Sequence, residues 1–313
     1  MRLFAPLLVL GLLAARTQSV QAVVIDDFAT GPISLENSLI GGFVDEIQTG
    51  LDPAHVAGGM RTWRYDVRSD FASDPPSTAK VRMGVGWPAS LPPGEGANRF
   101  YYQADDELTA VNFWLTYDAG VGSGAGPGLD IDLQALGHNA LVLDVLNADF
   151  DDNNGHLDIL AHSDSDGRSS FTPLPNSAKP YRAVAPLFRS TQPALGTIKR
   201  LRIGTSNGVL FGDFELGEIR TMNTADANFT GSVDGADFLV WQRNLGSGAS
   251  DIAADSVAKG DADLDGLVAA ADLDWWSAAV RRNAVAPAAS MAIPEPASLA
   301  LACLALISLR KRS

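Results

Sequence analysis

Apolar and polar residues alternate through most of the chain between residues 23 and 221. The alternation is clearest over 62–68, 79–87 and 111–118, where every second side chain is apolar. A period of two is typical of a strand with one buried face, and no long amphipathic helix interrupts the pattern. Clusters of Gly, Pro, Asn and Asp separate the runs, as expected for turns. Further strands are predicted at 23–28, 98–103, 140–147, 156–162, 198–204 and 208–220.

Many short strands with one polar face predict a mainly β fold in which two antiparallel sheets pack together. A jelly-roll-like antiparallel β-sandwich is the first interpretation for residues 23–221, and an immunoglobulin-like sandwich is the second.

A different pattern follows, because residues 226–282 contain two copies of one acidic segment, offset by 35 positions. In a loop of this type, oxygens at positions 1, 3, 5, 7, 9 and 12 surround a hard cation, and Gly at position 6 permits the turn. The oxygen-only ligand set favours Ca²⁺, so two calcium sites are predicted. Two Asx-rich turns without metal are the alternative. The candidate ligands are Asp226, Asn228, Thr230, Ser232, Asp234 and Asp237 in the first copy and Asp261, Asp263, Asp265, Leu267 and Asp272 in the second, with Ser232 and Leu267 contributing carbonyl oxygens.

Each loop precedes a predicted helix with an apolar stripe, formed by Phe238, Trp241 and Leu245 in the first copy and by Leu273, Trp276 and Val280 in the second. Residues 222–283 are therefore predicted to form a small α-helical calcium module, and the segment resembles a type I dockerin. That resemblance implies calcium binding and a cohesin-like partner.

Two features depart from the dockerin pattern. The family recognises its partner through hydroxyl residues at loop positions 10 and 11, where this chain has Gly235-Ala236 and Ala270-Ala271. Ala269 also stands at position 9 of the second loop. The resemblance therefore supports calcium binding more strongly than cohesin binding.

Both ends of the chain have the pattern of targeting signals. Residues 1–22 combine a basic start, a short apolar run and small residues before a cleavage site, as in a secretory signal peptide, although a buried N-terminal helix is the alternative. After a linker at 284–293, Pro294, Glu295 and Pro296 precede an uncharged run at 297–309 and a basic tail.

This C-terminal order resembles the PEP-CTERM sorting signal of Gram-negative bacteria, and a plain tail anchor is the alternative. The resemblance implies transient anchoring in the inner membrane, processing by an exosortase, and delivery to the cell surface or extracellular matrix.

The amino-acid composition limits the kinds of ligand and partner that this protein is expected to bind. Asp and Glu outnumber Lys and Arg by 37 to 23, which gives a net charge of −14. So acidic a surface excludes nucleic acid as a partner and predicts that any ligand of the body is neutral or cationic. The single Cys excludes an intramolecular disulfide.

Four segments of the body resemble jelly-roll carbohydrate-binding modules, and this resemblance implies a polysaccharide ligand. They are Val24–Phe28, Gly128–Leu133, Tyr181–Leu187 and Gly212–Arg220.

Three places in the body carry candidate chemistry. Trp114 falls on the polar face of its strand, either as a platform for a sugar ring or under the loop at 119–128. The segment Asp149–Gly155 is either a cation loop or a hairpin turn. His156, Asp158 and His162 share one strand face, which is either solvated or a metal or acid–base site.

The sequence contains no recognisable nucleophile–base pair, zinc motif or phosphate loop. An exported, non-enzymatic calcium-binding protein with a polysaccharide-binding sandwich is therefore expected. The alternatives are a structural envelope or matrix protein without a small ligand and a polysaccharide-active hydrolase.

Overall fold

A computed structural model describes residues 22–37, 43–67, 81–86, 98–104, 111–120, 128–150, 155–164, 167–187, 196–205, 212–248 and 252–285. The predicted signal peptide, apart from Ala22, lies outside the described residues, as do the predicted sorting motif and its apolar run. Most of the loops at 119–128 and 149–155 also lie outside them. None of the helices in the described ranges has the length and apolar character needed to cross a membrane.

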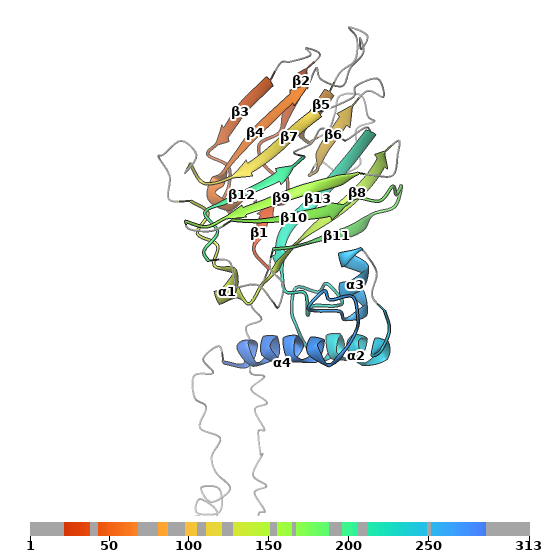
Figure 1. Ribbon diagram of the computed structural model, residues 1–313. Helices are drawn as coiled ribbons and strands as arrows, with labels where there is room; N and C mark the ends of the chain where they lie inside the picture. Colours follow the sequence, from red (N-terminus) through yellow and green to blue (C-terminus); the bar gives the residue numbers. More distant parts are fainter. Residues whose placement is uncertain are drawn as a thin grey trace, which may run out of the picture.

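Within these ranges the chain forms two antiparallel sheets packed face to face as a jelly-roll-like sandwich (Figure 1). Sheet A has the order β11-β8-β13-β6-β5-β2, with β1 also paired to β13, and sheet B has the order β10-β9-β12-β7-β4-β3. The strands of sheet A are β1 (Val24–Asp26), β2 (Ile33–Asn37), β5 (Val81–Val85), β6 (Phe100–Ala104), β8 (Ala140–Phe150), β11 (Tyr181–Pro186) and β13 (Gly212–Met222). Those of sheet B are β3 (Phe43–Thr49), β4 (Met60–Val67), β7 (Val111–Tyr117), β9 (His156–His162), β10 (Gly167–Pro173) and β12 (Arg200–Gly204).

The predicted mainly β sandwich is thus confirmed, and each predicted strand is present. Four strands have no counterpart among the predicted runs: β2, β3, β10 and β11, the last of which was marked only by the resemblance of Tyr181–Leu187. All four lie at sheet edges. On β3 the exposed run Asp45–Ile47 breaks the alternation, and on β10 the buried positions are Ser170 and Thr172. An edge strand covers less core than a central one, so its apolar pattern is weaker.

Aromatic side chains from both sheets fill the core. Phe100 and Phe214 of sheet A pack against Phe113 of sheet B, with ring centroids 5.9 and 5.8 Å from that of Phe113. Trp63 stacks on Phe100 at 5.8 Å, and all of these rings are buried. The alternation of the sequence thus becomes one continuous apolar layer between the sheets.

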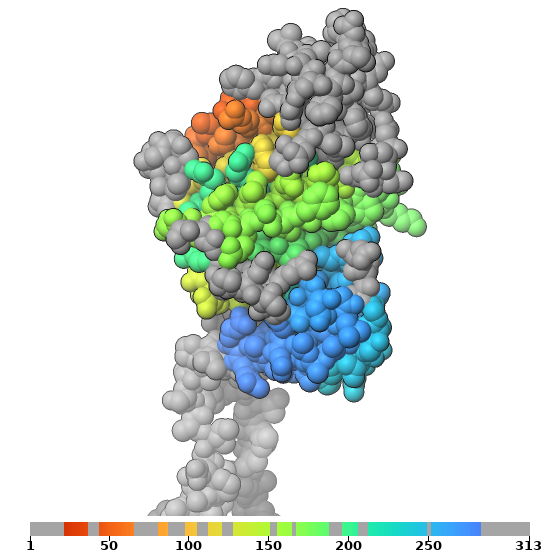
Figure 2. All heavy atoms as spheres, in the orientation of Figure 1, coloured from red at the N-terminus to blue at the C-terminus, as the bar shows by residue number. Residues whose placement is uncertain are grey.

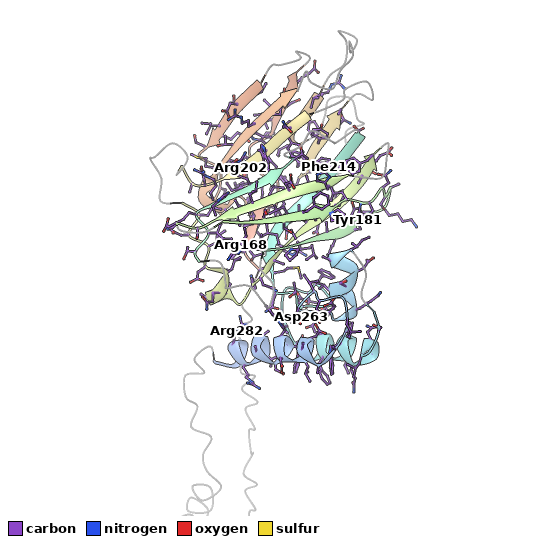
Figure 3. The ribbon with its side chains drawn as sticks, in the orientation of Figure 1. Arg168, Tyr181, Arg202, Phe214, Asp263 and Arg282 are labelled. Atoms are coloured by element: carbon purple, nitrogen blue, oxygen red, sulfur yellow. The ribbon has the colours of Figure 1, made fainter. Side chains whose placement is uncertain are left out.

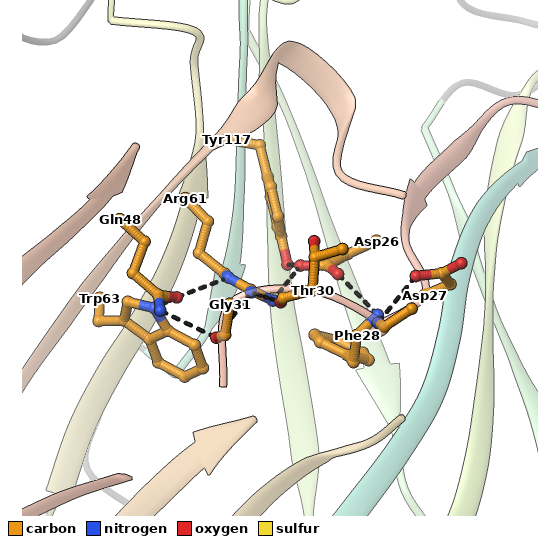
Figure 4. Close-up of polar contacts among 10 residues, drawn as sticks. Asp26, Asp27, Phe28, Thr30, Gly31, Gln48, Arg61, Trp63 and Tyr117 are labelled. Atoms are coloured by element: carbon orange, nitrogen blue, oxygen red, sulfur yellow. Dashed lines mark hydrogen bonds and ion pairs between the residues drawn. The ribbon is translucent and has the colours of Figure 1, made fainter. Parts of the chain in front are cut away.

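A buried ion pair lies at one side of this core (Figure 4). Arg61 and Asp26 are both 0% exposed, and the guanidinium donates to the Asp26 carboxylate at 2.8 Å. Tyr117 donates to the same carboxylate oxygen, and Arg61 also donates to Gln48. Because nearly every polar atom has a partner, the pair fixes β1 against β4 and β7 without leaving an isolated charge.

A short helix, α1 (Leu133–Leu136), precedes β8, and a 3-10 turn, η1 (Ala57–Gly59), precedes β4. The C-terminal module follows β13 directly and contains α2 (Gly235–Asn244), α3 (Ala253–Lys259) and α4 (Ala270–Val285). The helices after each loop are the predicted ones, whereas α3 has no counterpart in the sequence interpretation. Phe238 and Trp276 of the two predicted stripes meet with ring centroids 5.2 Å apart, but Leu245 is 54% exposed.

The module packs against the outer face of sheet A (Figures 1 and 2). Ala254 and Val257 of α3 form one buried cluster with Val142, Val184 and Met222 of the sandwich. The first half of β8 is therefore covered on both faces, which explains its uninterrupted apolar sequence from Ala140 to Leu143. The C-terminal module is thus a third layer of the fold on this side of the molecule.

Three hydrogen bonds join the sandwich to the module at Thr224. Its backbone N–H donates to Asn139 Oδ1 at 2.9 Å, and its hydroxyl accepts from Asn139 Nδ2 at 2.7 Å. The same hydroxyl donates to the carbonyl oxygen of Ala262, within the second loop. We call this set of contacts the Thr224 joint. Because Thr224 and Asn139 are buried, these bonds are shielded from competing water.

Candidate functional site

An open groove of about 480 Å³ lies on the outer face of sheet B. Strands β3, β4, β7 and β12 form its floor, and the chain just after β7 contributes to its rim. Its lining residues are Asp45, Ile47, Met60, Thr62, Arg64, Trp114, Thr116, Asp118, Gly120, Arg200 and Arg202.

Strand register brings these side chains together. Arg64 on β4 lies opposite Trp114 on β7, and Thr116 lies opposite Arg202 on β12. Since alternate residues of a strand point to the same face, the residues at these positions all stand on the side away from the core. Gly204, opposite Trp114 on β12, adds no side chain there.

Trp114 is half-buried in this groove, and a guanidinium contacts it. The central carbon of Arg202, a residue labelled in Figure 3, lies 4.2 Å from the centre of the indole ring. This is a cation–π contact. Residues 121–127 of the loop that was the alternative cover are outside the described residues. The role of Trp114 as a sugar platform therefore stays a prediction, with Arg202 as a neighbour that the sequence pattern did not reveal.

Positive charge gathers in the groove. Burial, and then the charges of Arg200 and Arg64, lower the pKa of Arg202. Burial and the charges of Arg200 and Arg202 also lower the pKa of His162 on the neighbouring strand β9. Arg200 lies 3.5 Å from the carboxylate of Asp118. The groove is thus a locally cationic part of an acidic protein.

The three polar residues of β9 share one face, as predicted, and alternate with buried apolar residues. His156 stacks on Phe171 of β10 with ring centroids 4.2 Å apart, and Phe171 is 63% exposed. Among the described residues, the carboxylates and histidines of β9 do not form a group close enough to hold a metal ion. The structure confirms the shared face, whereas the choice between a solvated face and an acid–base site stays a prediction.

The two acidic loops have the same backbone conformation. Phe229 and Leu264, 35 positions apart, have φ angles of 57° and 58°. Two residues later Gly231 and Gly266 have φ angles of 86° and 95°, the left-handed region that favours glycine. The sequence repeat therefore reflects a repeated structure.

In the second loop, the carboxylates of Asp261, Asp263 and Asp265 offer oxygen atoms within 4.8 Å of one another. Asp261 Oδ2 accepts from the N–H of Gly266, whereas its Oδ1 is buried and has no hydrogen-bond donor among the described residues. Burial, and then the charge of Asp272, raise the pKa of Asp261 to about 6. A buried carboxylate oxygen without a donor, beside further carboxylates, fits the ligand set of a hard cation.

The first loop repeats this arrangement with fewer charges. Asp226 accepts from the N–H groups of Thr230 and Gly231 at 3.0 and 2.7 Å, and burial raises its pKa to about 6. Asp237 accepts from the N–H groups of Asn228 and Asp234, which closes the loop. The first copy thus places its position 1 and position 12 carboxylates as the second copy does.

Position 9 differs between the loops. Asp234 caps α2 by accepting from the N–H of Ala236 at 2.7 Å. In the second loop Ala269 has no side-chain oxygen, and its N–H donates to Asp272 at 2.7 Å. Both position 12 carboxylates therefore hold the start of a helix as well as facing the loop.

Comparisons with known proteins give matches among solved structures only. No protein-family model matches the chain, and no curated protein matches it. One similar structure is a family 11 carbohydrate-binding module from Clostridium thermocellum in complex with a mixed-linked β-1,3-1,4 tetrasaccharide. It is 11% identical over 65% of this chain and 96% of that chain, with a TM-score of 0.33.

Two other similar structures have different ligands. The carbohydrate-binding module TmCBM61 in complex with β-1,4-galactotriose is 14% identical over 51% of this chain and 87% of that chain, with a TM-score of 0.26. A Stig cyclase from Fischerella sp. TAU is 15% identical over 64% of this chain and 98% of that chain, with a TM-score of 0.30. None of these similarities says what this chain binds.

Proposed function

We propose that this protein is an exported, non-enzymatic, calcium-binding surface or matrix protein whose sandwich binds a polysaccharide in the groove on sheet B. The observation that carries the proposal is Trp114, a half-buried indole in an open groove lined by arginines, carboxylates and hydroxyls. Aromatic rings and such polar groups are the two kinds of contact that a sugar chain uses. An open groove on a sheet also admits a long polymer better than a closed pocket does.

The calcium loops have a structural role in this proposal. Asp226, Asn228, Thr230, Asp234, Asp237 and the Ser232 carbonyl would hold one ion, and Asp261, Asp263, Asp265, Asp272 and the Leu267 carbonyl would hold the other. Bound calcium supplies positive charge that balances the clustered carboxylates. The buried, donor-free oxygen of Asp261 is the feature that supports an ion there. Because the second loop touches the Thr224 joint, calcium would also hold the module on sheet A.

Glycan binding is tested with the mature protein on a polysaccharide array, followed by titration of the strongest ligand. Trp114→Ala should weaken binding about tenfold without unfolding the domain, which corresponds to about 1.4 kcal/mol. Phe171→Ala is the matched control, since Phe171 is an exposed aromatic of the same sheet outside the groove. Absence of binding across the array would favour a matrix protein without a small ligand, and turnover of a polysaccharide would favour the hydrolase.

Calcium binding is tested by calorimetric titration of the metal-free protein. Two ions should bind, with affinities in the broad range of about 10⁻⁷ to 10⁻³ M. Asp261→Asn should remove the second site and leave the first. Asp255→Asn is the control, because Asp255 is an acidic residue of α3 outside both loops. Binding that Asp261→Asn leaves unchanged would contradict the assignment.

Export and sorting are proposed from the two ends of the chain. Replacement of Pro294, Glu295 and Pro296 by alanines should leave unprocessed protein in the inner membrane, since an exosortase-type enzyme would no longer recognise the tail. Cell fractionation and immunoblotting measure this outcome. Normal surface delivery of the variant would contradict the sorting role. A cohesin-like partner is the weaker proposal, and a pull-down with the calcium-loaded module tests it.

A further inference from the structure

We propose that the groove on sheet B selects an anionic polysaccharide, and that Arg202 binds its acidic group while Trp114 positions Arg202. This inference rests on the proposed function, because it names the class of polymer that the same groove would take. It also opposes the expectation from net charge, by which the ligand would be neutral or cationic.

The first argument is the pairing of arginines. Several other guanidinium groups of the sandwich lie next to carboxylates, in the pairs Arg61–Asp26, Arg82–Glu36, Arg99–Glu215, Arg182–Asp144 and Arg220–Asp144. Within the groove, Arg200 lies next to Asp118. Among the described residues, no carboxylate pairs with Arg202, whose contact is the ring of Trp114. Carboxylates are abundant in this protein, which has 37 acidic and 23 basic residues, so the lack of a carboxylate partner at Arg202 does not come from a shortage of acidic residues.

The second argument is electrostatic. Arg202 is half-buried, and the charges of Arg200 and Arg64 act on it from the same groove. Bringing like charges together at a partly desolvated surface is unfavourable. Asp118 offsets part of this cost at Arg200, and an anion placed beside Arg202 would lower the remainder. Charges beyond about 8 Å are screened at physiological salt, so these local groups outweigh the net charge of −14 at the groove.

The third argument is geometry. A guanidinium stacked on an aromatic ring uses its face, whereas its N–H donors lie in its plane. The central carbon of Arg202 lies over the Trp114 ring, 4.2 Å from its centre. In this proposal the face of the guanidinium contacts the indole, so its N–H fork can bind a two-oxygen group such as a carboxylate. The ring would also restrict the guanidinium before binding, so less conformational freedom would be lost when the anion binds.

A uronic acid carboxylate and a sulfate ester both offer the pair of oxygens that this fork binds. The shared chemistry is an oxyanion carried on a polysaccharide, and binding assays distinguish the two sources. Polygalacturonate and alginate are the carboxylate probes, dextran sulfate is the sulfate probe, and dextran, xylan and mixed-linkage β-glucan are neutral probes.

The experiment measures the affinity of the mature protein for these six polymers at one fixed free calcium concentration. We expect at least one acidic polymer to bind at least tenfold more tightly than every neutral one, with an affinity that falls as salt rises. Arg202→Gln should lower that affinity at least tenfold, and Arg202→Lys should restore only part of it. Arg182→Gln is the matched control, since Arg182 also contacts a ring, that of Phe229, but lies on sheet A and is paired with Asp144.

Trp114 has its own test as a positioning residue. Trp114→Phe keeps a ring under the guanidinium and should retain most of the affinity for the acidic polymer, whereas Trp114→Ala should not. In the Trp114→Ala variant, replacing Arg202 as well should cause little further loss, because the two residues act as one unit.

The outcomes distinguish a failure of the selectivity for anionic polymers from a failure of polysaccharide binding itself. Neutral polymers that bind as tightly as acidic ones would overturn the selection for anions and leave polysaccharide binding intact. Acidic binding that survives Arg202→Gln would overturn the role of Arg202. If none of the six polymers binds, polysaccharide binding itself fails, and the selectivity fails with it.

Discussion

Thr224→Val should loosen the C-terminal module from the sandwich with almost no change in the size of the side chain. Valine has the size of threonine but lacks the hydroxyl that joins Asn139 to Ala262. Its removal leaves the Nδ2 donor of Asn139 without that acceptor and the Ala262 carbonyl without that donor. Both contacts are buried.

The size of the effect follows from these two groups. Each buried polar group that loses its partner costs about 1–3 kcal/mol, so we expect Thr224→Val to lower the free energy of unfolding by about 3 kcal/mol. The backbone N–H of Thr224 keeps its bond to Asn139 Oδ1, which limits the loss. Thr224→Ser keeps the hydroxyl and should cost less than half as much.

Urea unfolding in saturating calcium measures this free energy, with far-ultraviolet circular dichroism and tryptophan fluorescence as separate probes. The two transitions should coincide in the original protein and separate in Thr224→Val, because the module would unfold first. A loss below 1 kcal/mol, or a serine variant as unstable as the valine variant, would refute the coupling through this hydroxyl.

Two further predictions concern buried charge. Burial and the charge of Arg282 lower the pKa of His138 to about 4, so the folded state favours the neutral ring. The stability that this group contributes is therefore full above pH 6.5 and falls as the pH drops toward 4, by about 2 kcal/mol at pH 5. Urea unfolding at pH 7 and pH 5 should show this difference in the free energy of unfolding, and His138→Gln should reduce it. Asp26→Asn should lower the free energy of unfolding, measured by thermal unfolding, by about 3–5 kcal/mol, because it leaves the Arg61 charge buried without its counter-ion. The double change Asp26→Leu with Arg61→Met removes both charges and should recover part of that loss.

The sequence predicted the sandwich because its central strands bury one face and therefore alternate. Strand β9 is an example, since every second residue from Leu157 to Ala161 is buried. The same rule fails for β3 and β10, whose edge positions place polar or exposed residues where a central strand has apolar ones. Edge strands are recognised through their neighbours, and a single sequence does not supply those neighbours.

The two acidic loops could be recognised as a repeat because their candidate ligands lie within twelve residues in each copy and recur at one offset. The groove could not be recognised, because Arg64, Trp114 and Arg202 come from three strands that only the register brings together. The Thr224 joint was hidden for the same reason, since Asn139 and Ala262 lie far from Thr224 along the chain. A site whose residues lie close together in the sequence can thus be predicted from their spacing. A site whose residues come from distant strands can be identified only once the fold is known.

The position of β13 has a mechanical consequence. This strand pairs with β8 on one side and with β6 and β1 on the other, and it leads directly into the first acidic loop. A pull on the C-terminal end of α4 would therefore reach the sandwich along the axis of β13. Its ladder hydrogen bonds run across the strand, so such a pull would load many of them together in shear rather than breaking them one at a time. Tension between a polymer held in the groove and the C-terminal end would thus fall on the strand that has the most partners in sheet A.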